Sequence, residues 1–298
     1  MSSSSYRGRF APSPTGPLHF GSLVSALASF LEARTHEGRW LLRIDDLDQT
    51  RKIDGMDSRI MRSLDSFGFE WDGPVAYQSQ NLEHYQEAMH RLQRAGQTYA
   101  CQCTRSQVRD RASVGIEGPI YPDTCRGQDL PDAKHRAIRI KTNDRPVRFC
   151  DRLFGEQTQC IHREIGDFVI RRADGYFAYQ LAVTVDDELA QITDVVRGAD
   201  LLTSTARQIH LQQLLGINPP TYLHVPLATD DQGRKLSKSD QAHPVDDATP
   251  VAALLDAWQF LNQATSPGAS ELSLADFWRW AMDHWNPESM PANTNIPL

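Results

Sequence analysis

The chain has 298 residues, of which 40% are hydrophobic and 23% charged, a length and composition that suit a globular protein with a sizeable core. No apolar run is long enough to span a bilayer, and a formal net charge of −7 argues against a nonspecific nucleic-acid coat. Because no apolar leader opens the sequence, we expect a cytoplasmic protein with no membrane partner.

The first hundred residues are expected to alternate strands and helices. The segment YRGRFAP predicts a strand, SPTGP a turn, and residues 19–38 a helix whose apolar residues recur three to four apart. The apolar strand RWLLRIDD follows, and then amphipathic helices over 53–69 and 81–97. This alternation predicts an α/β fold with a parallel sheet covered by helices.

The pattern breaks between about residues 100 and 165, which we expect to form an inserted module. The segments AIRIK (137–141) and VRFCD (147–151) predict short antiparallel strands joined by TNDRP. Between residues 101 and 172 there are 14 Lys and Arg against 10 Asp and Glu. This excess is equally consistent with a surface that faces a polyanion and with an ordinary solvated surface.

Regular elements return after the insertion. Residues 167–202 have strand character, and 203–216 predict a helix with Thr203 or Ser204 as its N-cap. A strand and a polar loop follow. From residue 246 the chain carries seven acidic residues and one basic residue, and it predicts two helices, over 249–261 and 273–285, before a loose end.

The opening strand, turn and helix predict an anion site. A helix N-terminus presents unpaired backbone N–H groups and partial positive charge, and Gly16 and Gly21 let a large ligand approach the backbone. His19, at the end of the turn, can donate a hydrogen bond to a phosphate, or it can simply cap the helix. Further along, Lys235 and Lys238 in the segment KLSKS suit a loop that closes over a triphosphate.

Three of the five cysteines lie within 25 residues, which raises the question of a metal site. Cys101, Cys103 and Cys125, with one oxygen or nitrogen ligand, would make a closed tetrahedral zinc site of structural type. The alternative is a set of free buried thiols. We expect the two remaining cysteines, Cys150 and Cys160, to be ordinary buried thiols.

Taken together, the turn PSPTGPLHFGS and the loop KLSKS resemble the HIGH and KMSKS motifs of class I aminoacyl-tRNA synthetases. The wider segments GRFAPSPTGPLHFGSL, LRIDDLDQTR, YACQCTR and VVRGADLL resemble the glutamyl branch of that family, over roughly residues 6 to 240. Two positions differ from the family pattern: position 45 is Asp where Glu is usual, and position 22 is Ser where the generic motif has a second His.

The resemblance implies a Rossmann-like class I catalytic domain with a zinc-bearing insertion and a small helical tail. We expect the catalytic domain in two halves, 6–100 and 166–245, a tRNA-facing insertion over 101–165, and an acidic tail over 246–298. In that tail we expect no anticodon-binding domain. Short paralogues of glutamyl-tRNA synthetase have a zinc site with a tyrosine as fourth ligand, which implies Tyr121 here. His135 is the rival fourth ligand.

The resemblance also implies an activity: formation of glutamyl-adenylate from L-glutamate and ATP with Mg²⁺, and transfer to queuosine at the wobble position of tRNA(Asp) by a monomer. It implies catalytic roles for His19, Lys235 and Lys238, with ATP held by His19, Gly21 and Lys238. The residues implied for glutamate are Arg9, Ala11, Ser13, Asp45, Tyr179 and Arg197. The alternatives are a truncated glutamyl-tRNA(Glu) synthetase, an inactive zinc-stabilised tRNA-binding module, and an unrelated nucleotidyltransferase.

Overall fold

The structure is a computed structural model that describes residues 5–229, 244–265 and 268–297. Within these residues, no helix is both long and apolar enough to cross a membrane. The helices in chain order are α1 (Phe20–Thr35), α2 (Met56–Ser66), α3 (Leu82–Arg94), α4 (Arg105–Arg109), α5 (Ile161–Glu164), α6 (Tyr179–Leu189), α7 (Leu202–Leu215), α8 (Pro250–Phe260) and α9 (Leu274–His284).

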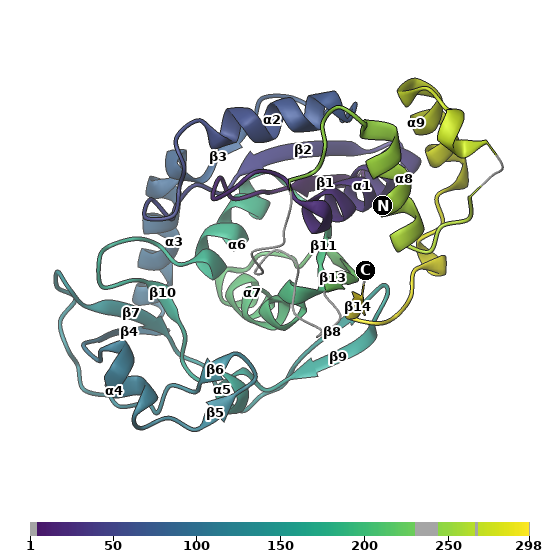
Figure 1. The fold of residues 1–298 in the computed structure, drawn as a ribbon. Helices are drawn as coiled ribbons and strands as arrows, with labels where there is room; N and C mark the ends of the chain where they lie inside the picture. The colour runs from purple at the N-terminus through teal and green to yellow at the C-terminus, as the bar shows by residue number, and fades with distance from the viewer. Residues whose placement is uncertain (1–4, 230–243, 266–267, 298) are drawn as a thin grey trace.

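Parallel strands form the centre of the molecule (Figure 1). The first three are β1 (Arg7–Phe10), β2 (Arg39–Ile44) and β3 (Ala76–Tyr77), paired in that order and all parallel. On the other side of β1 lie β11 (Asp194–Gly198), β12 (Thr221–Val225), β8 (Val147–Asp151) and β9 (Gly155–Gln159). The amide of Thr193 donates to the carbonyl of Arg7 at 3.0 Å and so joins the two halves. The α/β fold with a parallel sheet is therefore confirmed.

A separate set of short strands forms a lobe at the lower left of Figure 1. Its three-stranded antiparallel sheet consists of β4 (Thr98–Cys101), β7 (Ala137–Ile140) and β10 (Val169–Arg171), and its hairpin of β5 (Val114–Gly115) and β6 (Gly118–Pro119). The prediction that AIRIK and VRFCD pair with each other is wrong. The first, as β7, pairs with β4 and β10, whereas the second, as β8, pairs with β9 and with the parallel strand β12.

The first helix, α1, is predicted correctly, and the structure shows how it ends. Its last turn closes with bonds from the amides of Glu37 and Gly38 to the carbonyls of Arg34 and Ala33. Glu37, not Gly38, takes the left-handed backbone conformation, with φ of 51°. A Cβ on Gly38 would lie 2.5 Å from the carbonyl oxygen of Tyr6, so glycine is required there by close packing.

The helix α6 lies where the sequence predicted strand character. All residues from Gln180 to Asp187 are buried, so this stretch has no solvent-exposed face that would separate an inward apolar side from an outward polar side. Its β-branched residues Val183, Thr184 and Val185 also imitate a strand. The N-cap predicted for α7 is wrong as well: the helix begins at Leu202, directly after a 3₁₀ turn, and the hydroxyl of Thr203 donates to Glu117 instead.

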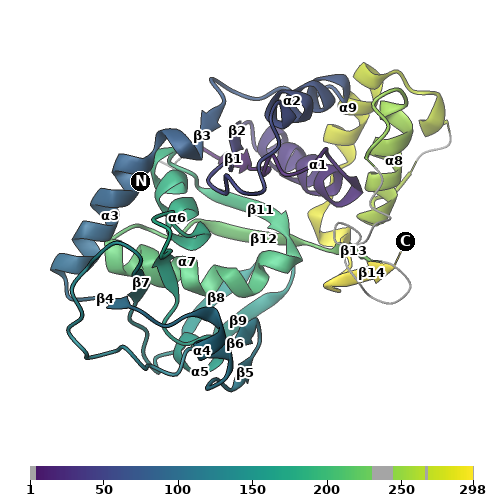
Figure 2. The same cartoon turned by 60° about the vertical axis from the view of Figure 1, so that its left-hand side comes forward.

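The tail packs firmly on the α/β core. Helices α8 and α9 lie against α1, at the opposite end of the molecule from the lobe in both views (Figures 1 and 2). The indole of Trp278 is buried there and donates to the carbonyl of Phe67 at 3.0 Å. The loose end predicted after α9 is wrong for residues 295–297, because β14 (Asn295–Pro297) pairs in parallel with β13 (Leu227–Thr229).

Candidate functional site

A cavity of about 550 Å³ opens at the carboxyl ends of β1 and β11, between the N-terminus of α1 and the start of α6. Clefts of this size at the carboxyl end of a parallel sheet are the usual ligand sites of such folds. Every residue predicted to contact glutamate or ATP that falls in the described part of the chain lines it: Arg9, Ala11, Ser13, His19, Gly21, Asp45, Tyr179 and Arg197. The cavity therefore brings together residues that lie up to 188 positions apart in the sequence.

Lys235 and Lys238 fall outside the described residues. The described chain on either side of them reaches the cavity, because Leu227 and Ala228 line it and Pro244 forms an antiparallel bridge with His19. The amide of Val245 also donates to the carbonyl of Leu18 at 3.0 Å. The flank before the KLSKS segment thus lines the cavity, and the flank after it contacts the turn before α1.

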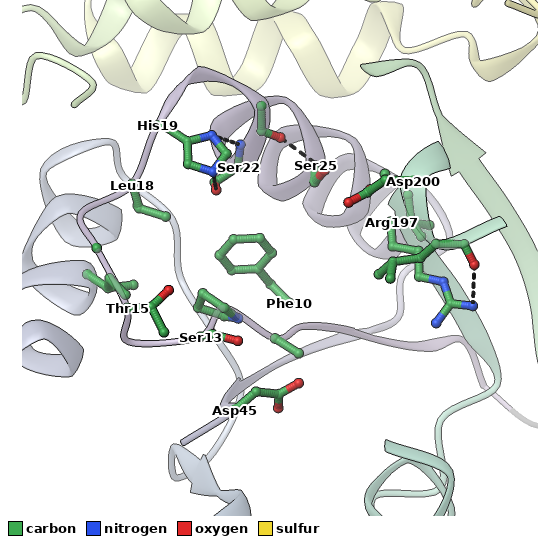
Figure 3. Close-up of a pocket in the computed structure, with 18 of the residues that line it drawn as sticks. Phe10, Ser13, Thr15, Leu18, His19, Ser22, Ser25, Asp45, Arg197 and Asp200 are labelled. Atoms are coloured by element: carbon green, nitrogen blue, oxygen red, sulfur yellow. Dashed lines mark hydrogen bonds between the residues drawn. The ribbon is translucent and has the colours of Figure 1, made fainter. Parts of the chain in front are cut away.

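His19 is the N-cap of α1 (Figure 3). Its Nδ1 accepts from the amide of Ser22 at 3.3 Å, and its Nε2 lies 3.1 Å from the hydroxyl of Ser22. A Cβ on the nearby Gly16 would meet no protein atom within 4 Å, so this part of the turn faces open space. The capping role and the site role of His19 are therefore compatible: the side chain is fixed at the helix N-terminus and lines the cavity.

On the opposite side of the cavity lies a buried ionic cluster that the sequence did not reveal. Arg43 donates from Nε to Asp45 at 2.7 Å and from Nη1 to Asp187 at 2.6 Å. Asp187 also accepts hydrogen bonds from Nε and Nη2 of Arg9, at 3.1 and 3.2 Å. With Asp186, 3.8 Å from Arg43, the cluster has two arginines and three aspartates, so its formal charge is −1.

The pKa directions in the cluster follow from this arrangement. Burial acts to raise the pKa of Asp187, but Arg9 and Arg43 outweigh it and hold that pKa below the usual value. Burial raises the pKa of Asp45 to about 6, because the opposing effect of Arg43 is shared with two other carboxylates. The carboxyl group of Asp45, which lines the cavity, is thus easier to protonate than that of Asp187, and a ligand cation beside it would favour its charged form.

Arg9 is one of the residues implied for glutamate, and the structure pairs it with the protein's own Asp187. These bonds use Nε and Nη2, so Nη1 is the nitrogen that remains for a ligand. Arg43 and Asp187 were missed because their partners come from distant segments. The one available signal was the pair of adjacent acids that interrupts the apolar run AVTVDDEL.

Arg197, on β11, forms a cationic side of the cavity (Figure 3). Its nitrogens donate to neutral acceptors: His224 Nε2 at 3.0 Å, Gln208 Oε1 at 2.8 Å and Thr205 Oγ1 at 2.9 Å. Among the described residues, no carboxylate lies within ion-pair distance of this guanidinium. Arg197 is only 6% exposed, so the site contains a buried cation that an anionic ligand would neutralise.

His224 fixes the position of Arg197 from behind. Its Nδ1 lies 2.7 Å from Asp151, and both side chains are fully buried. Because Nε2 accepts from Arg197, the proton of the neutral ring must be on Nδ1, where it is donated to Asp151. Burial lowers the pKa of His224 to about 4, so the ring stays neutral and keeps accepting from Arg197 at neutral pH.

The predicted metal ligands Cys101, Cys103, Cys125 and Tyr121 lie together in the lobe. The sulfur atoms of Cys101, Cys103 and Cys125 lie within 4.8 Å of one another, with 3.5 Å between those of Cys103 and Cys125. The hydroxyl of Tyr121 lies 3.4 Å from the sulfur of Cys101 and 3.8 Å from that of Cys103. His135 is exposed and lies outside this group of residues.

The donor set fits a divalent cation. In a tetrahedral site with Zn–S bonds of about 2.3 Å, neighbouring sulfurs are about 3.8 Å apart, close to the spacing here. Burial raises the pKa of Cys103 to about 11 and also raises that of Tyr121, so without a cation both would keep their protons. The expectation that Cys150 and Cys160 are buried is wrong: Cys150 is exposed and Cys160 half-buried.

Comparisons with known proteins agree with this geometry. The model of the family described as tRNA synthetases class I (E and Q), catalytic domain, matches residues 5–271. A glutamyl-Q tRNA(Asp) synthetase of Dechloromonas aromatica (strain RCB) is 49% identical over 297 residues, 99% of each chain. One of Aromatoleum aromaticum is 48% identical over 286 residues, 96% of this chain and 90% of that one. The solved glutamate-tRNA synthetase of Elizabethkingia anophelis is 25% identical, with a TM-score of 0.80, and the match covers 99% of this chain and 68% of that one.

Proposed function

The chain belongs to the class I tRNA synthetase family (E and Q), and from that premise we propose that it activates L-glutamate with ATP and transfers it to queuosine at the wobble position of tRNA(Asp). Relatives that match nearly the whole chain carry the name of this activity. The structural observation that carries the proposal is the division of charge in the cavity. The cluster around Asp45 is net negative, and Arg197, facing it, is a buried cation without a carboxylate partner among the described residues.

Glutamate has the complementary charges. Its α-ammonium would pair with Asp45, and its side-chain carboxylate would accept hydrogen bonds from Arg197 and from Nη1 of Arg9. Tyr179, Ala11 and Ser13 would complete the pocket. Because Asp is shorter than the Glu usual at position 45, the ammonium must lie nearer the Arg43–Asp45 pair or reach it through a water molecule.

ATP would bind at the turn before α1. His19, Gly21 and the backbone amides of the helix N-terminus would hold the phosphates, and Lys235 and Lys238 would complete the site. An α-carboxylate oxygen of glutamate attacks the α-phosphorus in line; a new O–P bond forms as the bond from the α-phosphorus to the departing pyrophosphate breaks. Mg²⁺ bound with ATP would offset phosphate charge. The chain's own residues act by positioning and charge stabilisation.

In the second step a hydroxyl of the cyclopentene-diol of queuosine attacks the carbonyl carbon of the adenylate. An ester bond forms, the hydroxyl loses its proton, and AMP departs. We assign contact with the anticodon stem-loop to the insertion, residues 101–165, which separates the two halves of the catalytic domain in the sequence. The tail, residues 246–298, takes no part in this contact. The excess of basic residues over 101–172 is compatible with contact to a polyanion. A monomer in the cytoplasm belongs to the same proposal.

The decisive experiment compares labelled-glutamate transfer to tRNA(Asp) with and without queuosine. We expect transfer only to the queuosine-containing RNA, with release of label under mild alkali. Transfer to the 3′ end of tRNA(Glu) would indicate a conventional glutamyl-tRNA synthetase. If the protein exchanges no pyrophosphate into ATP in the presence of glutamate, it is an inactive RNA-binding module. Exchange that does not depend on an amino acid would indicate an unrelated nucleotidyltransferase.

The proposed zinc site has a direct test. We expect one zinc ion per chain, held by Cys101, Cys103, Cys125 and Tyr121, and its loss in a Cys125→Ser variant. Because the lobe has few buried apolar residues around these ligands, loss of zinc should make residues 101–135 sensitive to protease. Metal content by mass spectrometry and limited proteolysis measure both effects. Cys150→Ser is the matched control, and equal zinc content in the two variants would contradict the assignment.

The raised pKa of Asp45 predicts a pH-dependent affinity for glutamate. The carboxyl group must be ionised to bind the ammonium, so its contribution is present above its pKa of about 6 and is lost as the pH falls through that value. We expect the KM for glutamate in pyrophosphate exchange to be level from pH 7 to 8 and to rise about tenfold per unit well below 6.

An Asp45→Asn variant should have a high KM for glutamate at every pH. Glutamate itself does not titrate between pH 5 and 8, and His224 has a pKa of about 4, below that interval. Measuring the KM for ATP in parallel shows whether a pH effect is confined to glutamate. A pH-dependent KM for glutamate that persists in Asp45→Asn would contradict the assignment of the ammonium to Asp45.

A further inference from the structure

The hairpin of β5 and β6 presents exposed apolar side chains. Val114 is 88% exposed, the highest value among the large hydrophobic residues of the described chain, and Ile116 is 51% exposed. Single exposed apolar residues are common on protein surfaces. Two of them at the tip of one hairpin, two positions apart in the sequence, form a small apolar surface that faces solvent.

The hairpin is held firmly on the molecule. A Cβ on Gly115 would lie 2.0 Å from the carbonyl oxygen of Glu164, so the backbone packs directly on α5. Glu117 receives Arg207 Nη2 at 2.6 Å and the hydroxyl of Thr203 at 2.5 Å, which fixes the hairpin to the start of α7. The apolar tip is therefore preorganised, and a partner would bind it with little loss of conformational freedom.

Hydrogen bonds between side chains connect this anchor to the cavity. Arg207 donates to Ser204 at 2.9 Å, and Ser204 also accepts from Gln180 at 3.1 Å. Gln180 accepts from Gln208 at 3.0 Å, and Gln208 accepts from Arg197 at 2.8 Å. These hydrogen bonds run through buried side chains of α6 and α7, so the hairpin has a fixed position relative to the glutamate pocket.

Three exposed arginines precede the apolar tip in the sequence. Arg105 and Arg109 of α4 and Arg111 after it are exposed, and none forms an ion pair within the described part of the chain. Helix α4 lies beside the hairpin in both views (Figures 1 and 2). Glu117, the hairpin's own acid, is already paired with Arg207. Asp110, between Arg109 and Arg111, is also exposed, so residues 105–111 carry a formal charge of +2 on a chain whose net charge is −7.

We propose that residues 105–119 form the docking surface for the RNA loop that carries the modified nucleotide. Val114 and Ile116 pack against the face of an unstacked base or its ribose, and Arg105, Arg109 and Arg111 contact phosphates. Single-stranded RNA loops expose both base faces and closely spaced phosphates, which matches an apolar tip within a group of arginines. This inference rests on the proposed function and names the part of the insertion that carries RNA recognition.

The test uses the full chain and two RNAs: the tRNA(Asp) anticodon stem-loop with queuosine and with guanosine. A Val114→Ser/Ile116→Ser variant should bind the queuosine stem-loop about tenfold more weakly, since neither serine can bury an apolar side chain against the base. Glutamate transfer should fall in proportion, whereas adenylate formation measured without RNA reports on the cavity alone. The control is Leu189→Ser, which removes an apolar residue of 46% exposure at the far end of α6.

An Arg105→Gln/Arg109→Gln/Arg111→Gln variant tests the binding of phosphates. Its plot of log affinity against log salt should be shallower, by about 0.7 for each phosphate that the variant no longer neutralises. The inference would be overturned if the double serine variant and the triple glutamine variant both bound the stem-loop with wild-type affinity and salt dependence. If the wild type transfers glutamate to no queuosine-containing RNA, the proposed function fails. Stem-loop binding then still decides this inference: a weakened Val114→Ser/Ile116→Ser variant supports it, and an unchanged one overturns it.

Discussion

An Arg197→Met variant will lose glutamate activation while it keeps ATP binding. We expect kcat/KM for glutamate in pyrophosphate exchange to fall by about two to three orders of magnitude, because truncating one member of a buried, hydrogen-bonded charge pair costs about 2–5 kcal/mol. The substitution removes the cation that would meet the side-chain carboxylate. It also leaves acceptors on His224, Gln208 and Thr205 without their donor.

Two comparisons make this result specific. Arg197→Lys keeps the charge but not the fork of donors, so we expect an intermediate loss that appears mainly in KM. The affinity for ATP, measured by equilibrium binding, should stay within about twofold of wild type in both variants, since the phosphates bind at the other side of the cavity. A normal KM for glutamate in Arg197→Met would place the side-chain carboxylate elsewhere.

The second large effect is on stability. An Asp187→Ala variant should lose about 3–5 kcal/mol of unfolding free energy, because it leaves two buried arginines without their common carboxylate. Arg9 and Arg43 are 5% and 4% exposed, so water cannot replace the missing partner. Urea unfolding followed by tryptophan fluorescence and by far-ultraviolet circular dichroism measures the change.

The matched control is Asp174→Ala, which breaks an exposed pair with Arg172 and should cost no more than about 1 kcal/mol. An Arg9→Met/Asp187→Leu double variant should recover part of the loss, since apolar groups of similar size need no partner. The assignment of Asp187 as the centre of the cluster would be contradicted if Asp187→Ala and Asp174→Ala unfolded at the same urea concentration.

The sequence predicts a helix well when the helix buries one side and exposes the other. Helices α1, α2 and α3 are predicted by apolar residues at helical spacing. Helix α6 is not, because it is buried on every side and its β-branched residues resemble those of a strand. Strand pairing is harder still: β7 and β8 follow each other in the sequence, yet they belong to different sheets, and only the complete fold decides this.

The candidate site also has parts that the sequence predicts and parts that it does not. The turn before α1 gives the positions of Arg9, Ser13 and His19 directly, since they lie within one short motif. The sequence does not show that Arg43 and Asp187, 144 residues apart, meet beneath the pocket. Nor does it show that Arg197 is held by neutral acceptors only. Charge compensation of this kind is a property of the folded interior, where partners arrive from distant segments.

The pairing of β13 with β14 has a consequence for biosynthesis. Strand β13 ends at Thr229, immediately before the residues that carry Lys235 and Lys238, and its parallel neighbour is Asn295–Pro297. During translation β13 is synthesised before its partner strand β14, so the pair can form only after residues 295–297 have left the ribosome. The strands β1 and β11 beside the cavity can pack together earlier in synthesis. The pairing of β13, the strand that precedes the lysines, comes later. Proteins extended or shortened near residue 297 should be checked for this strand pair before their activity is compared.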